Sequence, residues 1–137
     1  MDGKITVTWK YVKPLKAKDD VKSFLKENSI DLPGCLVSLI ENNNGGRPSA
    51  KDFITSDGVE HVFKSLLSYN ADDSEPIYSI YDEVFSKTSL YPIGTDPAGN
   101  FICFDRKERN YCYWNHETNM NLKIIQMSFL PVTGETC

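Results

Sequence analysis

The chain has 137 residues, of which 40% are hydrophobic and 12% aromatic, and its formal net charge is −4. This length and composition favour one domain with a substantial core, which we expect to span residues 1–137, with its core at about 9–129 and a short tail at 130–137. No run of about 18 apolar residues predicts a membrane span, and the first residues lack the apolar stretch of a secretory signal. We therefore expect a cytoplasmic protein with no membrane partner.

Residues 1–26 differ in charge from the rest of the chain. They contain seven lysines and three aspartates, an excess of four positive charges, so the remaining residues carry a net charge of −8 within the total of −4. A negative body repels phosphate backbones and attracts basic partners, so we expect no direct binding of nucleic acid. The lysine-rich start is interpreted as a solvated strand and helix face, with an anion-binding arm as the alternative.

The first third of the chain predicts one strand and two helices. Residues 5–12 alternate and are rich in β-branched and aromatic side chains, as a strand or extended segment requires. A first helix should begin at Asp19 or Asp20. Asp31 can cap a second helix, Pro33 suits its first turn, and its apolar face is formed by Leu32, Leu36, Leu39 and Ile40.

The middle of the chain predicts a loop followed by a strand. Residues 47–58 are polar and rich in turn formers, so we expect a loop that one aromatic side chain, Phe53, anchors. Residues 59–70 alternate through Val59, His61 and Phe63, which favours a strand. His61 is then expected at a sheet edge or half buried, and not in catalysis.

Residues 71–87 predict the clearest helix of the chain. Ser74 can cap it, Pro76 suits its first turn, and its buried face should consist of Ile77, Ile80, Tyr81 and Val84. Paired carboxylates can act as general acid and base, but carboxylates near a helix start more commonly favour its dipole and are solvated. We therefore expect no catalytic residue among the acidic side chains of this segment, Asp72, Asp73, Glu75, Asp82 and Glu83.

The segment 91–105 is an apolar run that T-D-P-A-G-N interrupts once. Pro97 has a fixed φ, Gly99 can adopt a positive φ, and Asp96 and Asn100 can hydrogen-bond to nearby backbone. These residues predict a hairpin corner rather than an active-site loop.

Two further strands follow this corner. Residues 101–105 and 110–114 can form a hairpin whose connection is 106–109, in a register that places Phe101 opposite Trp114 and Cys103 opposite Cys112. Both faces of such a hairpin are apolar, so it should lie centrally in the sheet, covered on both sides.

The cysteines and histidines predict no metal site. Cys35, Cys103, Cys112 and Cys137 lack C-x-x-C spacing, and His61 and His116 lie far apart. We expect neither a metal nor a cofactor, and we expect all four cysteines to remain thiols, including Cys103 and Cys112, which would face each other across the hairpin.

An ordered set of motifs resembles the SUKH superfamily. The motifs are Leu32-Pro33 at a helix start, Asn44-Gly45-Gly46 after it, F-x-x-L-L-S-Y-N at 63–70, Y-P-I-G-T-D-P-A-G-N-x-I-C-F-D at 91–105 and Y-W-N-H-E at 113–117. The resemblance runs from Trp9 to Phe129. It implies an α+β domain in which helices flank a central antiparallel sheet, with structural roles for the motif residues Leu32, Pro33, Gly45, Gly46, Asp96, Gly99, Asn100, Asp105 and Trp114.

The same resemblance implies a function without catalysis. Bacterial members are typically immunity proteins that bind and neutralise polymorphic toxins, often nucleases, whereas fungal members of the Smi and Knr type are regulators. We expect a cognate toxin domain, basic and often a nuclease, as the partner, with a regulatory or scaffolding module as the alternative. The candidate partner-binding residues are Asp72, Asp73, Glu75, Asp82, Glu83, Glu60, Tyr69 and Tyr78.

The end of the chain departs from the resemblance. Relatives usually continue into a longer helix, but Pro131 disfavours helical backbone at Leu130, so any helix that starts at Leu122 should stop there. Residues 130–134, LPVTG, match a sortase sorting motif, but without an export signal or an apolar anchor we regard the match as coincidence.

Overall fold

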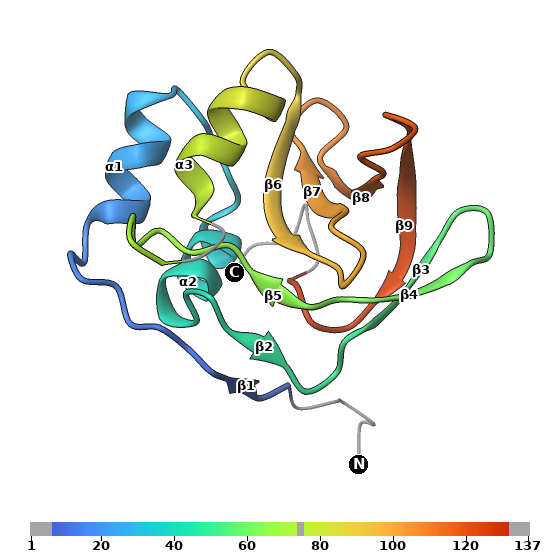
Figure 1. Ribbon diagram of the computed structural model, residues 1–137, viewed down its shortest axis with the longest axis horizontal. Coiled ribbons are helices and arrows are strands. Elements are labelled where there is room, and N and C mark those ends of the chain that lie inside the picture. The colour runs from blue at the N-terminus through green and yellow to red at the C-terminus, as the bar shows by residue number, and fades with distance from the viewer. Residues whose placement is uncertain (1–6, 74–75, 132–137) are drawn as a thin grey trace.

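A curled antiparallel sheet organises the chain, as the computed structural model shows for residues 7–73 and 76–131 (Figure 1). Each strand of this sheet is antiparallel to its neighbours. The order across the sheet is β4 (Glu60–Val62), β3 (Asp52–Thr55), β9 (Asn121–Met127), β8 (Asn110–Trp114), β7 (Phe101–Asp105), β6 (Leu90–Thr95) and β5 (Ser65–Leu66). A separate two-stranded ladder joins β1 (Trp9–Lys10) to β2 (Arg47–Pro48).

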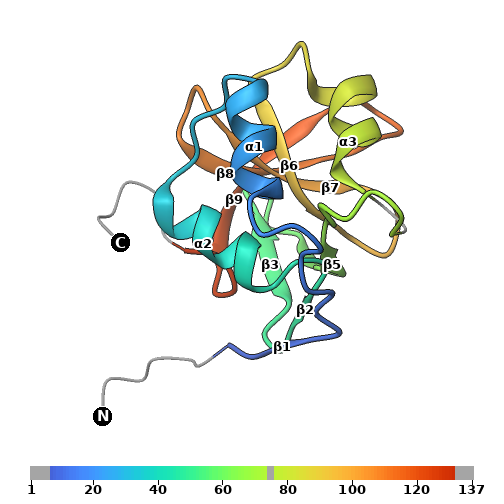
Figure 2. The same ribbon diagram turned by 90° about the vertical axis from the view of Figure 1, so that its left-hand side faces the viewer.

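Three helical segments pack against this sheet. They are α1 (Asp20–Glu27), α2 (Gly34–Asn42) and α3 (Ile77–Ile80), which continues into a π-helical turn, η1 (Tyr81–Phe85). Helices α1 and α3 lie side by side in both views (Figures 1 and 2), and the ring of Phe24 meets those of Tyr78 and Tyr81 at centroid distances of 5.2 and 5.6 Å. The α+β class with an antiparallel sheet is therefore confirmed. Within the described ranges, no helix is both long enough and apolar enough to cross a membrane.

The predicted central hairpin has the predicted register. Strands β7 and β8 pair Phe101 with Trp114 and Cys103 with Cys112, and β6 and β9 lie on either side of them. Both cysteines are buried and neither forms a disulfide. Cys35, in contrast, is disulfide-bonded, so the prediction of reduced thiols is wrong for that residue. Cys137 lies outside the described residues. The hairpin is central because both of its faces are apolar and must be covered.

The predicted cap of α2 is wrong. The helix begins at Gly34, and the preceding Pro33 has extended backbone with φ −54° and ψ 138°. Asp31 therefore lies before an extended residue and makes no side-chain hydrogen bond to the helix start. Helix α1 begins at Asp20, as predicted, although Asp19 likewise forms no side-chain cap.

The buried face of the third helix also differs from the prediction. Val84, expected inside, is 38% exposed, whereas Phe85 is 1% exposed. The π-helical turn at Tyr81–Phe85 is the reason, because it adds residues to a turn and rotates the following side chains away from α-helical spacing. Its buried positions are Tyr81 and Phe85, spaced four apart.

The expected loop at 47–58 contains strands β2 and β3, so that prediction is wrong. Phe53 lies within β3, between β4 and β9, and is 1% exposed. The four residues of β3 are too few for their alternation to be recognised. The pairing that holds them comes from β9, distant in sequence.

The strand predicted over 59–70 is divided into β4 and β5. The Phe63 N–H donates to Lys51 O at 2.8 Å and the Lys64 N–H to Thr95 O at 2.7 Å. Phe63 is therefore the last residue that bonds on the β3 side, and Lys64 is the first that bonds to β6. Residues 60–66 thus connect the two edges of the sheet.

The end of the described chain is a strand and not a helix. Residues 121–127 form β9, which pairs with both β3 and β8. Ile124 faces the core, whereas Ile125 is 59% exposed at a bulge. The helical interpretation is wrong because this segment is hydrogen-bonded to a strand on each side. Residues 132–134 of the LPVTG match lie outside the described residues.

Candidate functional site

Two of the motifs meet at a buried asparagine. Asn44, fully buried, accepts a hydrogen bond from the Tyr69 N–H at 2.8 Å and donates to the Ser68 hydroxyl at 3.1 Å and to the Lys13 carbonyl at 2.9 Å. Hydrogen bonds of Asn44 thus connect the Asn-Gly-Gly segment to the Ser-Tyr-Asn segment and to the lysine-rich start of the chain. Gly46 follows closely, and a Cβ there would lie 2.8 Å from the Asn43 carbonyl oxygen.

A second set of polar contacts continues this connection. The Asn70 side chain donates to Pro14 O at 3.0 Å and accepts from the Lys16 N–H at 2.9 Å. The Lys16 ammonium pairs with Asp72, whose pKa is lowered by the hydrogen bond from Lys16, and the Ser68 hydroxyl donates to Asp73 at 2.6 Å. Asp72 and Asp73 are therefore engaged within the molecule.

The predicted hairpin corner is confirmed in its details. One carboxylate oxygen of Asp96 accepts from the N–H groups of Ala98 at 3.0 Å and Asn100 at 2.8 Å, and Gly99 has φ +86°. Tyr113 donates its hydroxyl proton to the other oxygen of Asp96 and accepts from the Asn100 amide at 2.7 Å. Burial, the larger cause, and the hydrogen bond to Asp96 raise the Tyr113 pKa to about 12.

Asp105 has the structural role that the sequence predicted for it. Its carboxylate accepts from the N–H groups of Lys107 at 3.0 Å and Glu108 at 3.2 Å, which closes the turn between β7 and β8. It also accepts from the Ser89 hydroxyl at 3.0 Å.

The candidate acidic residues do not form one surface. Asp82 and Glu83 are exposed on η1, and Asp72 is exposed in the loop before α3. Asp73 is half buried, and Glu75 lies outside the described residues. Glu60 lies on β4, across the sheet from α3 (Figure 1).

The two candidate aromatic anchors face inward. Tyr69 is 2% exposed, and its hydroxyl hydrogen-bonds to that of Tyr91. Tyr78 is half buried against Phe24 and donates its hydroxyl proton to the Tyr69 carbonyl. Of the eight proposed partner-binding residues, the described exposed ones are Glu60, Asp72, Asp82 and Glu83.

A polar cluster near the β3–β4 turn brings together a hydroxyl, a carboxylate and an imidazole. The Thr55 hydroxyl donates to Asp57 at 2.5 Å and lies 3.2 Å from Nε2 of His61. The hydrogen bond from Thr55 lowers the Asp57 pKa. Thr55 is fully buried, so its hydroxyl is closed to a substrate. Elsewhere in the described residues no group of three or more His, Cys, Asp or Glu side chains could hold a metal ion.

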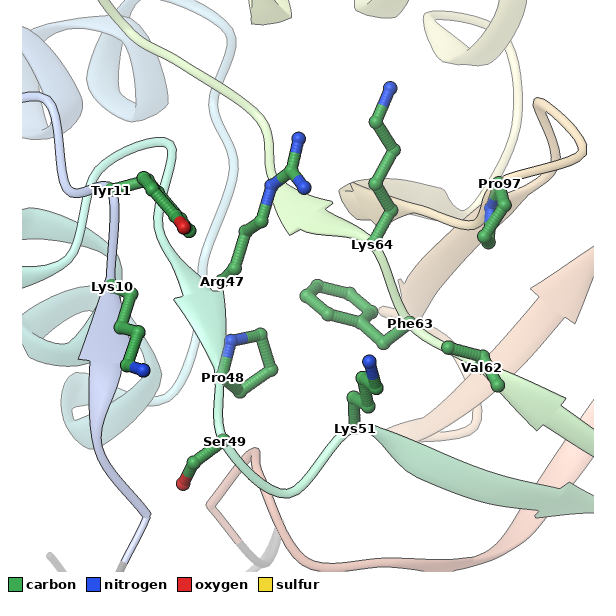
Figure 3. A pocket seen from close by; sticks show the side chains of 10 residues that line it. All are labelled: Lys10, Tyr11, Arg47, Pro48, Ser49, Lys51, Val62, Phe63, Lys64 and Pro97. Carbon is green, nitrogen blue, oxygen red and sulfur yellow. The ribbon is translucent and has the colours of Figure 1, made fainter.

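A basic cavity that the sequence did not predict lies between the β1–β2 ladder and residues 62–64 (Figure 3). Its volume is about 480 Å³. We call it the cationic pocket, and its lining consists of Lys10, Tyr11, Arg47, Pro48, Ser49, Lys51, Val62, Phe63, Lys64 and Pro97. Lys10 belongs to the lysine-rich start, which was interpreted as a solvated face with an anion-binding arm as the alternative, and no local pattern connects it to Arg47, Lys51 and Lys64.

Comparison with known proteins gives one family. The model of the SMI1 / KNR4 family (SUKH-1) matches residues 17–129, which contain the helices, the seven-stranded sheet and the Asp96 corner. Searches of curated proteins and of solved structures gave no significant match. The match covers most of the chain, and the resemblance of its motifs agrees with it. The chain therefore belongs to the SMI1/KNR4 (SUKH-1) family.

Proposed function

We propose that this chain is a non-enzymatic immunity protein that binds and neutralises a cognate toxin domain. Membership of the SUKH-1 family carries the proposal, because immunity to polymorphic toxins is the typical role of the bacterial members. The buried, internally bonded state of two motif residues supports it. Asp96 and Asn100 are hydrogen-bonded within the hairpin corner and are each 6% exposed, so neither side chain is open to a substrate.

The toxin-binding surface that we propose is the acidic face, which we define as Asp72, Asp82 and Glu83. Asp82 and Glu83 are adjacent on η1, whose Phe85 packs against the rings of Phe101 and Trp114. Nuclease surfaces that bind phosphates are cationic. Negative charge on η1 would therefore speed association with the toxin and favour one relative orientation of the two proteins. Asp72 is partly neutralised by Lys16, so most of the effect should come from η1.

The test begins with capture of the partner. The purified chain, used as bait at low salt in lysate of the native organism, should retain a basic toxin domain in near-equal amount, identified by mass spectrometry. Co-expression of the chain with that domain should then restore growth. Retention of housekeeping or wall-synthesis proteins, without any protection, would instead support a regulatory module.

The acidic face is tested with the captured toxin. Asp82→Lys with Glu83→Lys should slow association by at least about tenfold at low salt, and the difference should shrink as salt is added. The matched control is Glu108→Lys with Glu117→Lys, which reverses two exposed carboxylates outside this helix. Equal on-rates for both double variants would remove the acidic face from the proposal and leave the immunity role standing.

A further inference from the structure

We propose that the cationic pocket binds an acidic peptide segment of a partner protein, one that carries carboxylates beside an apolar side chain. The inference concerns a surface other than the acidic face, and it stands whether or not the partner is a toxin.

The charges of the pocket are the first reason. Lys10, Arg47 and Lys51 form no ion pair within the ranges that the structure describes. The β1–β2 ladder pairs Lys10 with Arg47, and Figure 3 shows their side chains extending in different directions from it. No carboxylate is among the lining residues in the part of the chain that the structure describes. Anionic groups of a ligand would give these cations partners.

The conformation of Tyr11 is the second reason. This side chain is 73% exposed, and its backbone has φ +58°, which is unfavourable for a bulky residue. The Arg47 guanidinium lies over its ring, 5.6 Å from the centroid. Strained backbone that presents an exposed aromatic ring beside a cation is a feature of ligand-binding positions.

The apolar part of the pocket defines the rest of the ligand. Figure 3 shows the Phe63 ring beside Pro48, below the Arg47 and Lys64 side chains. Phe63 is 1% exposed and Pro48 is buried, so they form the inner wall of the pocket. Val62 and Pro97 are exposed at the rim. A volume of about 480 Å³ lies within the usual range for ligand pockets and is large enough for a few side chains. One apolar side chain of the ligand can contact the exposed Val62 and Pro97 while flanking carboxylates reach Lys10 and Lys51.

Short peptides fit this pocket better than nucleic acid does. The residues after the lysine-rich start carry a net charge of −8 within the formal total of −4, so a long polyanion would meet repulsion beyond the pocket. A segment with a few carboxylates can place all its charge next to Lys10, Arg47 and Lys51. Lysine, a point charge on a flexible stem, can pair with a carboxylate in many geometries.

The experiment titrates the isotope-labelled full chain with a blocked peptide, Glu-Asp-Phe-Asp-Glu, at low salt, and follows the amide resonances. We expect saturable shifts concentrated at residues 9–11, 47–51 and 62–64. The peptide Glu-Asp-Ala-Asp-Glu should bind more weakly, and Lys-Lys-Phe-Lys-Lys should not compete. Inorganic pyrophosphate and a short single-stranded oligonucleotide are tested as competing ligands.

Variants locate the binding. The double variant Arg47→Gln with Lys51→Gln should lower the affinity for the acidic peptide by about tenfold. The control, Lys26→Gln with Lys87→Gln, removes two exposed cations elsewhere and should leave affinity unchanged. Tyr11→Gly should keep or raise the melting temperature, because glycine adopts positive φ without strain, and should still weaken the peptide.

Three results would overturn the proposal. One is tighter binding of pyrophosphate or the oligonucleotide than of the acidic peptide. Another is equal loss of affinity in the pocket variant and its control. The third is the absence of saturable shifts at the pocket in a chain that gives a native spectrum.

Discussion

At the scale of single residues, Tyr113 connects the hairpin corner to the sheet. It is 6% exposed on β8, and its hydroxyl group lies between the Asp96 carboxylate and the Asn100 amide. Asn100 in turn accepts from the His116 N–H at 3.0 Å. The corner therefore depends on a tyrosine outside it.

Replacing this hydroxyl should destabilise the protein and change its response to alkali. Tyr113→Phe leaves Asp96 with one donor fewer in a buried position, which should cost about 1–3 kcal/mol in the free energy of unfolding. The Tyr113 pKa is raised from 10.0 to about 12, so the unfolded chain loses this proton first and stability falls as pH rises from 10.0 towards 12. Urea unfolding from pH 8 to 12 should therefore show a shallower alkaline loss for Tyr113→Phe than for the wild type. An unchanged slope would mean that this hydroxyl titrates normally.

The motif residues show what a sequence reveals at this scale. The turn hydrogen bonds of Asp96 and Asp105 and the positive φ of Gly99 could be predicted, because the bonds of a turn join residues two to four apart in sequence. Gly94 was not singled out, yet a Cβ there would lie 2.3 Å from Cζ of Phe63. The requirement for glycine at this position comes from Phe63 and Ser65, which are distant in sequence, so no local pattern encodes it.

At the scale of elements, the π-helical turn decides which side chain anchors the third helix. Phe85→Ala should cost about 3–5 kcal/mol, because the ring is 1% exposed and packs on Phe101 and Trp114 at 5.4 and 5.2 Å. Val84→Ala should cost less than about 1 kcal/mol, because Val84 is 38% exposed. Chemical denaturation of both variants measures the difference. Equal losses of unfolding free energy in the two variants would contradict the finding that the π-helical turn buries Phe85 and exposes Val84.

Elements were predictable where their partners are near in sequence. The β7–β8 register follows from one short connection, and α1 from its apolar spacing and acidic start. Strands β3, β4 and β9 were missed or misjudged, since short strands carry little periodicity and their order depends on distant pairing. Lys10, Arg47 and Lys51 also come together only in the fold, so the sequence did not predict the cationic pocket. Most of the acidic candidate residues, in contrast, lie close together in the sequence.

At the scale of the whole molecule, the small β1–β2 ladder and the main sheet are joined by buried contacts. Leu66 N–H donates to Gly46 O at 3.0 Å, and Lys13 N–H to Asn44 O at 2.8 Å. Asn44 bonds to the backbone of Tyr69 as well. These contacts should make the ladder, and with it the cationic pocket, unfold together with the sheet. The exact limits of the domain, 1–137, stay a prediction.

The two tryptophans of the chain can test this cooperativity, because each reports on one part. Trp9 lies on β1, and Trp114 lies on β8 against Phe85. The variant Trp9→Phe keeps only Trp114, so its fluorescence should report unfolding of the sheet. The variant Trp114→Phe keeps only Trp9, so its fluorescence should report unfolding of the ladder. In urea, each transition should coincide with that variant's own far-ultraviolet circular dichroism transition in midpoint and slope. A Trp9 transition at lower urea would mean that the ladder opens independently, so that the pocket would form and disappear without loss of the sheet.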